Sequence, residues 1–159
     1  KMVGAEVYVA DVSQAKLDML KDIGVAGTIL NTGDEDFKKQ VEAITGGDGF
    51  DVCIEAVGLT STFMNCIDAA AFRGRVVVVG VGKQSLDFFY TIIQKKELDI
   101  YGSRNAMKDD FLEVIDYVRD GKVNLGSVVS REYGFEDAGQ AFHDMATQGG
   151  ELLKLMLKF

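Results

Sequence analysis

The sequence predicts an α/β fold built on a parallel sheet, and the clearest sign of this lies in its middle third. Residues 50–58 and 74–82 are two apolar runs in which β-branched residues continue without polar alternation, as in strands buried on both faces. Residues 60–71, between them, have the apolar spacing of a helix. The unit is therefore strand, helix, strand, and sheets of this kind bind ligands beyond the carboxyl ends of their strands.

Each expected helix around this unit carries an apolar stripe and a capping residue. The helix between the two strands has Phe63, Ile67 and Ala70 at helical spacing and Thr60 or Ser61 as its N-cap. Two strand and helix pairs precede it. Strand 7–10 ends at Asp11 and leads into a helix with Ser13 near its cap and Leu17, Leu20 and Ile23 inward. Strand 28–30 leads into a helix with Asp34 as its cap and Phe37, Val41 and Ile44 inward.

The elements after residue 82 follow the same alternation. We expect a short extended piece at 86–88 that turns helical through Ile92 and Ile93, a strand at 98–101 and a helix at 109–120. A brief strand at Val128 and Val129, a helix at 135–147 and a half-buried strand at 153–159 complete the chain. The inward residues of the two later helices are Phe111, Ile115 and Val118, then Ala138, Ala141, Phe142 and Met145.

Length and charge limit the possible functions. The 159 residues are enough for one domain with a proper core, and 17 basic against 25 acidic residues give a net charge of −8. Nucleic acid and anionic membranes attract basic surfaces, so we expect neither as a partner. Cys53 and Cys66 form no CxxC pair, and no apolar run is long enough to cross a bilayer. We expect reduced core thiols in a cytoplasmic protein.

Asp11 is the first candidate for a binding role. An acidic side chain at the carboxyl end of the second strand of a nucleotide-binding fold can accept both ribose hydroxyls of adenosine, and its charge repels a 2′-phosphate, which favours NAD over NADP. Capping of the following helix explains the residue equally well. Lys16 could reach the same ribose, or it could be an ordinary surface lysine.

The glycines at positions 80 and 82 match a dinucleotide fingerprint poorly, because Ser85 stands where the next glycine is required. They fit a close approach of backbone to ligand, or turn geometry alone. His143, the single histidine, has no nucleophile or metal-ligand spacing near it, and Glu55 and Asp87 suit ion-pair or capping roles. The residues alone indicate a nucleotide-binding α/β domain without a catalytic constellation.

Four runs give the chain a recognisable likeness: residues 4–11, 51–58, 74–80 and 96–103. With them the chain resembles the coenzyme domain of zinc-type medium-chain alcohol and polyol dehydrogenases. The end of the chain, with 121–123, 138–142 and Lys154, is similar as well. Among the subfamilies, these motifs are most similar to those of sorbitol, threonine and sugar-acid dehydrogenases.

The resemblance implies a Rossmann-type, doubly wound parallel sheet in the order 3-2-1-4-5-6, with NAD bound across its switch point. It implies that Asp11 and Lys16 lie at the adenosine ribose, that residues 56–58 line the path of the cofactor, and that two further segments approach the nicotinamide. The cofactor-binding residues expected in this way are Asp11, Lys16, Ala56, Val57, Gly58, Val79, Gly80, Val81, Tyr101, Gly102, Ser103 and Lys154. It also implies a homo-oligomer formed through edge segments around Leu86 and Phe88 and around Leu98 and Tyr101.

The departures from the family pattern matter as much. The first strand with its GxGxxG loop should immediately precede Lys1, and neither it nor the zinc-bearing catalytic domain is in the sequence. We therefore expect a single truncated dinucleotide-binding domain over 1–159, whose part from about 127 returns toward the absent catalytic domain. The sheet would be split between its second and fourth strands, leaving apolar edges that promote association. No residue of this chain is expected to bind zinc or to be catalytic.

The function implied is the NAD-binding part of a zinc-dependent dehydrogenase that oxidises a secondary alcohol, a polyol or sugar acid, by hydride transfer. The fragment alone is expected to bind NAD weakly or not at all and to be inactive. Two alternatives stay open at this point. One is a stand-alone nucleotide-binding regulatory domain, and the other is an S-adenosylmethionine-dependent methyltransferase, which also places an acidic residue after the second strand.

Overall fold

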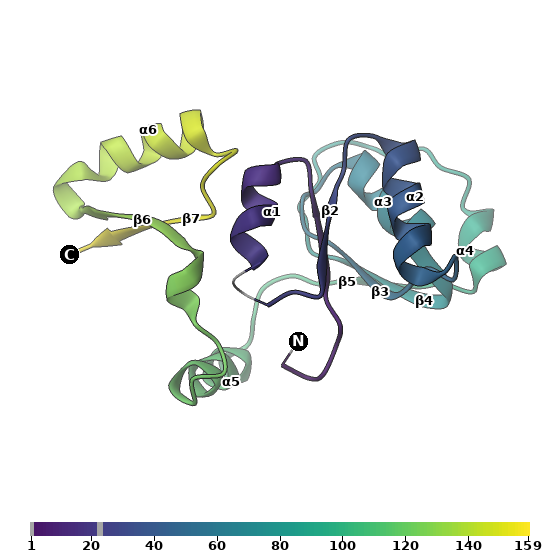
Figure 1. Ribbon diagram of the computed structural model, residues 1–159, viewed down its shortest axis with the longest axis horizontal. Helices are drawn as coiled ribbons and strands as arrows, with labels where there is room; N and C mark the ends of the chain where they lie inside the picture. The colour runs from purple at the N-terminus through teal and green to yellow at the C-terminus, as the bar shows by residue number, and fades with distance from the viewer. Residues whose placement is uncertain (1, 22–23) are drawn as a thin grey trace. The chain divides into compact units, whose positions relative to one another are not determined.

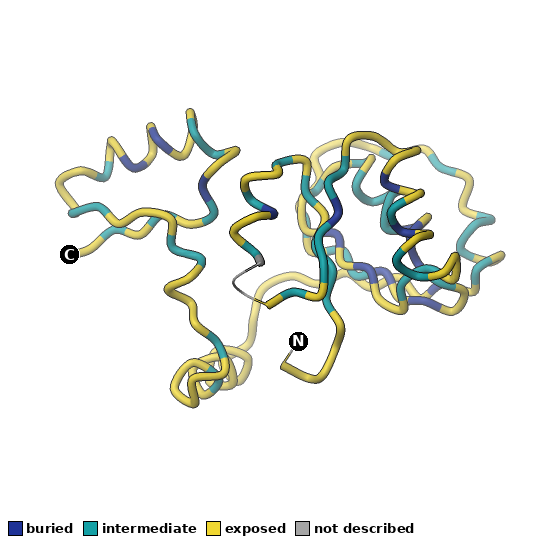
Figure 2. The backbone as a smooth tube through the Cα atoms, viewed as in Figure 1, coloured by how far each residue is buried: buried dark blue, intermediate teal, exposed yellow. Residues whose placement is uncertain are grey.

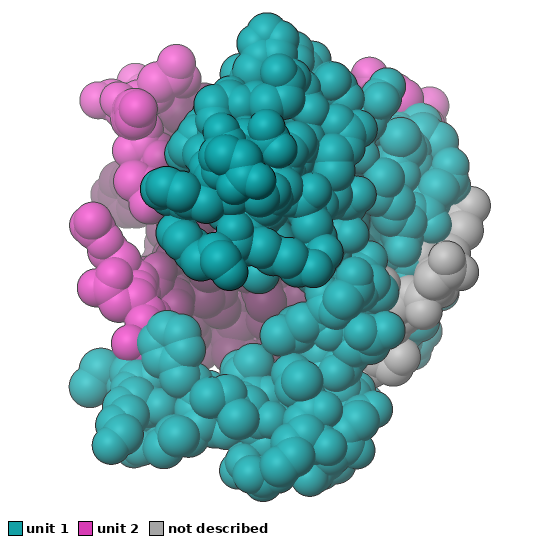
Figure 3. Space-filling model, turned by 90° about the vertical axis from the view of Figure 1, so that its left-hand side faces the viewer, with its two compact units in different colours: residues 1–31, 107–159 teal, residues 32–106 magenta. Residues whose placement is uncertain are grey.

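The computed structural model describes residues 2–21 and 24–159, with only the backbone of Lys21. The chain divides into two compact units, which Figure 3 colours separately. Unit 1 comprises residues Lys1–Asn31 and Met107–Phe159, and unit 2 comprises residues Thr32–Ala106. Each unit is described by itself.

Unit 2 contains the strand, helix, strand motif of the middle of the chain. Its elements are α2 (Asp34–Thr45), β3 (Phe50–Glu55), α3 (Thr60–Ala69), β4 (Ala70–Val78), α4 (Thr91–Lys96) and β5 (Asp99–Gly102). The three strands form one parallel sheet in the order β3-β4-β5, with Cys53 opposite Val76 and Val76 opposite Ile100. Figure 1 shows α2 and α3 stacked on the same side of this sheet. The predicted extended piece at 86–88 is not a strand in the structure.

The core of unit 2 lies between its sheet and its helices. Ile67 of α3 and Val76 of β4 are fully buried, and Cys53 of β3 is buried beside them. Along β3, however, burial alternates, and Val52 and Ile54 are 40% and 63% exposed. The prediction that this strand is buried on both faces is therefore wrong. An apolar run of this kind is typical of a strand with packing partners on both faces. In this structure the contacts of β3 with α3 lie on the face that carries Cys53.

Two helix starts differ from the sequence prediction by one residue. The N-cap of α3 is Leu59, whose backbone is extended, so Thr60 and Ser61 already lie in the helix. The hydroxyl that caps this turn belongs to Thr62, which accepts the Leu59 N–H at 3.3 Å. The N-cap of α2 is Gly33, and Asp34 lies in the first turn, where its negative charge suits the positive end of the helix dipole.

The end of α3 is capped by a lysine from another helix. Lys96 Nζ, at the end of α4, donates to the carbonyl oxygens of Ile67 (3.1 Å), Asp68 (2.7 Å) and Ala70 (2.8 Å). These carbonyls belong to the last turn, which has no partners of its own within the helix. Burial lowers the pKa of the Lys96 ammonium, and its approach to Asp68 offsets this only in part. The lysine therefore ties α4 to the end of α3.

Unit 1 contains two small parallel sheets. Its elements are β1 (Tyr8–Asp11), α1 (Gln14–Lys21), β2 (Gly27–Leu30), α5 (Lys108–Arg119), the 3-10 turn η1 (Leu125–Val128), β6 (Val129–Gly134), the 3-10 turn η2 (Phe135–Asp137), α6 (Ala138–Gln148) and β7 (Lys154–Lys158). Strand β1 pairs with β2, and β6 pairs with β7. Leu17 of α1 is buried, as predicted, and Ile29 of β2 is buried too. Ile23 lies outside the described residues.

The apolar stripes of the later helices are less covered than predicted. Helix α5 has no buried residue, and Phe111 and Ile115 are 63% and 56% exposed (Figure 2). In α6, Ala141 is buried as predicted, but Phe142 and Met145 are exposed. Periodicity identified the apolar side of each helix correctly, but it carries no information on whether another element lies against that side.

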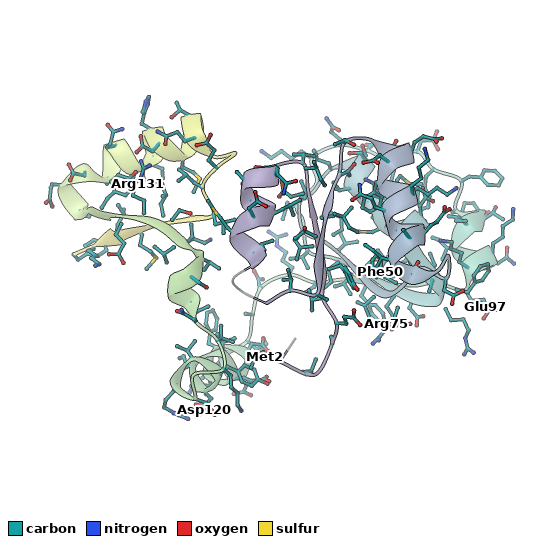
Figure 4. All side chains as sticks on the ribbon, in the orientation of Figure 1. Met2, Phe50, Arg75, Glu97, Asp120 and Arg131 are labelled. Carbon is teal, nitrogen blue, oxygen red and sulfur yellow. The ribbon has the colours of Figure 1, made fainter. Side chains whose placement is uncertain are left out.

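A polar residue occupies the buried side of α6 instead. The carboxylate of Asp144 accepts hydrogen bonds from Arg131 (2.6 Å), Tyr133 (2.5 Å) and Gln140 (2.7 Å). Figure 4 labels Arg131, which β6 supplies. The hydrogen bonds from Tyr133 and Gln140, with the nearby guanidinium, lower the pKa of Asp144. Every donor of this cluster comes from β6 or α6, so it fastens the helix to its neighbouring strand.

Among the described residues the strands form three separate sheets, and no helix there is long and apolar enough to cross a membrane. The orders β1-β2 and β3-β4-β5 are the two parts that the predicted order 3-2-1-4-5-6 leaves when its first strand is absent. The predicted parallel α/β architecture is confirmed.

Candidate functional site

The carboxyl ends of the three strands of unit 2 meet at one edge of the sheet. Glu55, the last residue of β3, is opposite Val78 of β4, and Val78 is opposite Gly102 of β5. The Ser103 N–H donates to the Val78 carbonyl at 2.8 Å. The chain therefore leaves the sheet at this edge in residues 56–58, 79–81 and 101–103, which we call the carboxyl rim. Nine of the twelve predicted cofactor-binding residues belong to it.

Two backbone segments of the carboxyl rim touch at Gly58 and Gly80. A Cβ on Gly80 would lie 2.3 Å from the Gly58 nitrogen and 2.4 Å from Glu55 Oε2. A Cβ on Gly58, whose φ is +86°, would lie 2.8 Å from the backbone of Val81. No side chain fits between these segments, so glycine is required at both positions. The glycines let the two backbone segments touch, and the residues beside them, Val57, Val79 and Val81, expose their side chains.

Glu55 links both segments of the rim. Its backbone carbonyl accepts the N–H groups of Val79 (2.8 Å) and Gly80 (3.0 Å). Its side-chain Oε1 accepts the N–H groups of Val57 and Gly58, both at 2.8 Å, and the Thr62 hydroxyl at 2.7 Å. The side chain is 2% exposed.

The environment of this carboxylate favours its charged form. Burial raises the pKa of Glu55, but the hydrogen bonds from Thr62, Gly58 and Val57 outweigh it, and the pKa lies below its ordinary value. Glu55 is therefore an anion at neutral pH with its donors already in place, which suits a structural acceptor and not a proton-transfer group.

A groove of about 260 Å³ opens beside the glycines of the rim. It combines Glu55, Gly58 and Gly80 with the rings of Phe63 and Phe88, which meet edge to face at 5.7 Å. A slightly larger groove of about 290 Å³ lies between α2 and α3, near Gly49 and Ala70, where β3 and β4 begin. Ligands of parallel α/β sheets bind at the carboxyl ends of the strands, so the groove beside the rim is the better candidate.

The remaining predicted residues belong to unit 1. Asp11 ends β1, and its Oδ1 accepts the Ser13 N–H at 2.8 Å, the capping role considered for it. The Ser13 hydroxyl in turn donates to the Gly150 carbonyl at 2.7 Å. Lys16 lies in the first turn of α1, and Lys154 is the exposed first residue of β7. This hydrogen bond uses Oδ1 and not Oδ2 of Asp11. The binding of Asp11 to a ribose stays a prediction.

The described residues do not fit a zinc ion. No group of three or more histidine, cysteine, aspartate or glutamate side chains comes together among them. Burial raises the pKa of Cys53 to about 12 and that of Cys66 to about 11, the charge of Glu55 adding to the latter. Both are free thiols, Cys53 buried and Cys66 partly buried, and such protonated sulfurs are poor metal ligands. His143 is on α6, where its carbonyl accepts the Thr147 hydroxyl.

Sequence reasoning placed the rim correctly but missed how it is held. Glu55 was considered for a capping role, yet Thr62 and Lys96 were not singled out. A sequence signal for the contact between Glu55 and Thr62 exists. A glutamate ends an apolar strand, a glycine follows three residues later, and a threonine follows four residues after the glycine. The spacing places a hydroxyl of the first helical turn beside the carboxylate.

Parallel strands linked by helices, with glycines where the chain leaves their carboxyl ends, are the architecture of doubly wound α/β proteins, many of which bind nucleotides. The chain belongs to the zinc-binding dehydrogenase family, whose model matches residues 1–120.

Individual relatives agree with this assignment. The chain is 30% identical over 159 residues to L-galactonate-5-dehydrogenase of Escherichia coli, covering 100% of this chain and 46% of that protein. It is 30% identical over 161 residues to sorbitol dehydrogenase 1 of Saccharomyces cerevisiae, covering 96% and 44%. A crystal structure of an NAD-dependent alcohol dehydrogenase matches with a TM-score of 0.82 at 26% identity, covering 98% and 44%. The chain thus spans less than half the length of these relatives.

These relatives are dehydrogenases of alcohols, polyols and sugar acids, and the resemblance seen in the sequence is confirmed. They lend no support to the regulatory-domain or methyltransferase alternatives.

Proposed function

We propose that this chain is the coenzyme-binding part of an NAD-dependent, zinc-dependent dehydrogenase that oxidises a secondary alcohol, a polyol or a sugar acid. The observation that carries the proposal is the family match, together with the close contact of Gly58 and Gly80 at the carboxyl ends of the strands. Proteins similar to it over the whole chain are named for L-galactonate and sorbitol. Its compartment would be the cytoplasm, where free thiols such as Cys53 and Cys66 persist.

The rim supplies position and not chemistry in this proposal. NAD, when bound, is the hydride acceptor. Residues 56–58 would line its path, residues 79–81 and 101–103 would lie near the nicotinamide, and Lys154 would lie near the pyrophosphate. Asp11, with Lys16 beside it, would bind the adenosine ribose and disfavour a 2′-phosphate. The zinc ligands and the residues that select the alcohol would belong to a part of the protein outside these 159 residues.

The proposal is tested with the full-length product of the gene that encodes this chain. Purified with zinc, it should reduce NAD in the presence of L-galactonate, sorbitol or a related polyol, and reduce NADP much more slowly. Asp11→Asn keeps an acceptor for the Ser13 N–H but removes the charge, so it should narrow the preference for NAD over NADP. Loss of the preference for NAD without loss of the fold would support the ribose role. No NAD-linked oxidation of any secondary alcohol would contradict the proposal.

The 159-residue chain alone should bind NAD weakly or not at all and should have no dehydrogenase activity. The GxGxxG loop, which brings backbone N–H groups and a helix N-terminus to the pyrophosphate in such folds, is not in the sequence. Calorimetric titration of the chain with NAD measures this directly. Low-micromolar binding would contradict the prediction.

A further inference from the structure

One residue beneath the carboxyl rim holds both of its glycine-bearing segments. The Glu55 carbonyl accepts two N–H groups of the 79–81 segment, and the Glu55 carboxylate accepts two N–H groups of the 56–58 segment. The two segments also touch at Gly58 and Gly80. A movement of the Glu55 side chain would therefore release residues 56–58 and loosen their contact with residues 79–81.

We propose that Glu55 is a positioning residue of the cofactor site, which fixes the backbone of residues 56–58 against residues 79–81 so that the rim is rigid before the cofactor arrives. The inference rests on the proposed function, because it concerns the same site. This role needs no direct contact between Glu55 and the cofactor. It acts through the N–H groups of Val57 and Gly58, which donate to its carboxylate.

Thr62, in the first turn of α3, supports the Glu55 carboxylate. The Thr62 hydroxyl donates to Glu55 Oε1 at 2.7 Å, and the hydroxyl oxygen of Thr62 accepts the Leu59 N–H. The first turn of α3 is thus tied to the carboxylate that holds the rim, so the end of β3, the turn and the start of α3 form one hydrogen-bonded unit. Preorganisation of this kind increases affinity because ordering of the loop no longer opposes binding.

An ionised acceptor matters for this role. Hydrogen bonds to a charged oxygen are about twice as strong as those between neutral groups. Glu55→Gln keeps the size of the side chain and one acceptor oxygen but removes the charge. Glu55→Ala removes both side-chain acceptor oxygens and leaves the N–H groups of Val57 and Gly58 without partners, so that variant could fail to fold and is not the deciding one.

The experiment uses the full-length gene product and measures NADH affinity by fluorescence, together with hydrogen exchange of the Val57 and Gly58 amides. Glu55→Gln should weaken NADH binding roughly tenfold and speed exchange at both amides, since charge-assisted bonds become neutral ones. Thr62→Val should act in the same direction, and Thr62→Ser, which restores the hydroxyl, should recover the wild-type values.

Asp144→Asn is the matched control. Asp144 is also a buried carboxylate with three donors, and it belongs to the β6 and α6 cluster, not to the rim. It should lower thermal stability without changing NADH affinity.

The outcomes separate the two claims. Normal NADH binding by wild type together with unchanged affinity in Glu55→Gln would overturn the inference and leave the proposed function standing. An equal loss of affinity in Asp144→Asn would also overturn it, because the effect would then follow general destabilisation. Failure of the wild-type protein to bind NADH would overturn the proposed function and this inference together.

Discussion

Lys96 shows at the residue scale how a charged side chain can serve a purely structural end. Its ammonium group donates to three carbonyls at the end of α3. We predict that Lys96→Met, which keeps the aliphatic stem, lowers the free energy of unfolding by about 2–3 kcal/mol, the order expected for losing charge-assisted hydrogen bonds. Urea unfolding at neutral pH measures the change. Lys95→Met is the control, because Lys95 is exposed and its loss should change stability by less than about 0.5 kcal/mol.

Glu55 gives a second residue-scale prediction, in the pH dependence of stability. Its pKa is lower in the folded protein than its ordinary value. The stabilisation it provides is therefore complete above the unfolded pKa of about 4.3 and is lost as the pH falls through the folded pKa. Wild type should exceed Glu55→Gln in stability at pH 7, and the difference should shrink as the pH is lowered below 4. A difference that does not change with pH, in unfolding curves recorded across that range, would contradict this account.

The residue scale is also where sequence reasoning was least complete. It identified Gly58 and Gly80, because glycines at strand ends are visible in a sequence. The hydrogen bonds of Glu55 and Lys96 to backbone groups were out of its reach, because the positions of those groups depend on turns. Lys96 is 26 residues from Ala70, and no local pattern connects them.

At the scale of elements, the turn between α2 and β3 separates two effects of glycine. Gly46 and Gly49 both have positive φ, 66° and 86°, but a Cβ on Gly46 meets nothing within 4 Å, whereas one on Gly49 would lie 2.8 Å from the Ala69 carbonyl oxygen. Gly46→Ala should cost about 1–2 kcal/mol of stability from the left-handed backbone alone. Gly49→Ala should cost clearly more, because backbone atoms of neighbouring residues must move. Equal losses, measured by thermal unfolding, would contradict the role assigned to the contact.

The order and type of the elements followed from the sequence because apolar spacing is a local property. Helical spacing placed Leu17 and Ile67 inward, the unbroken apolar run of its strand placed Val76 inward, and all three are fully buried. The same rule failed for Phe111 and Phe142, which are exposed. The prediction for β3 failed for a related reason. Ile54 has a β-branched side chain typical of a buried strand, but it is exposed. Periodicity states what an element requires, and only the rest of the fold decides whether the requirement is met.

At the scale of the whole molecule, uncovered apolar surface and unpaired strand edges should make the 159-residue chain associate. The described sheet of unit 2 ends at β3 and at β5, and β3 exposes Val52 and Ile54 on one face. An edge of this kind is a template for another chain. We predict concentration-dependent dimers or larger species in sedimentation equilibrium. Ile54→Lys should shift the distribution toward monomer with little change in stability, because a lysine on an edge strand opposes pairing. Val12→Lys is the matched control: Val12 is also exposed but lies outside any strand, and it should not alter the distribution. A chain that remains monomeric at all concentrations would show that these edges are not sites of association.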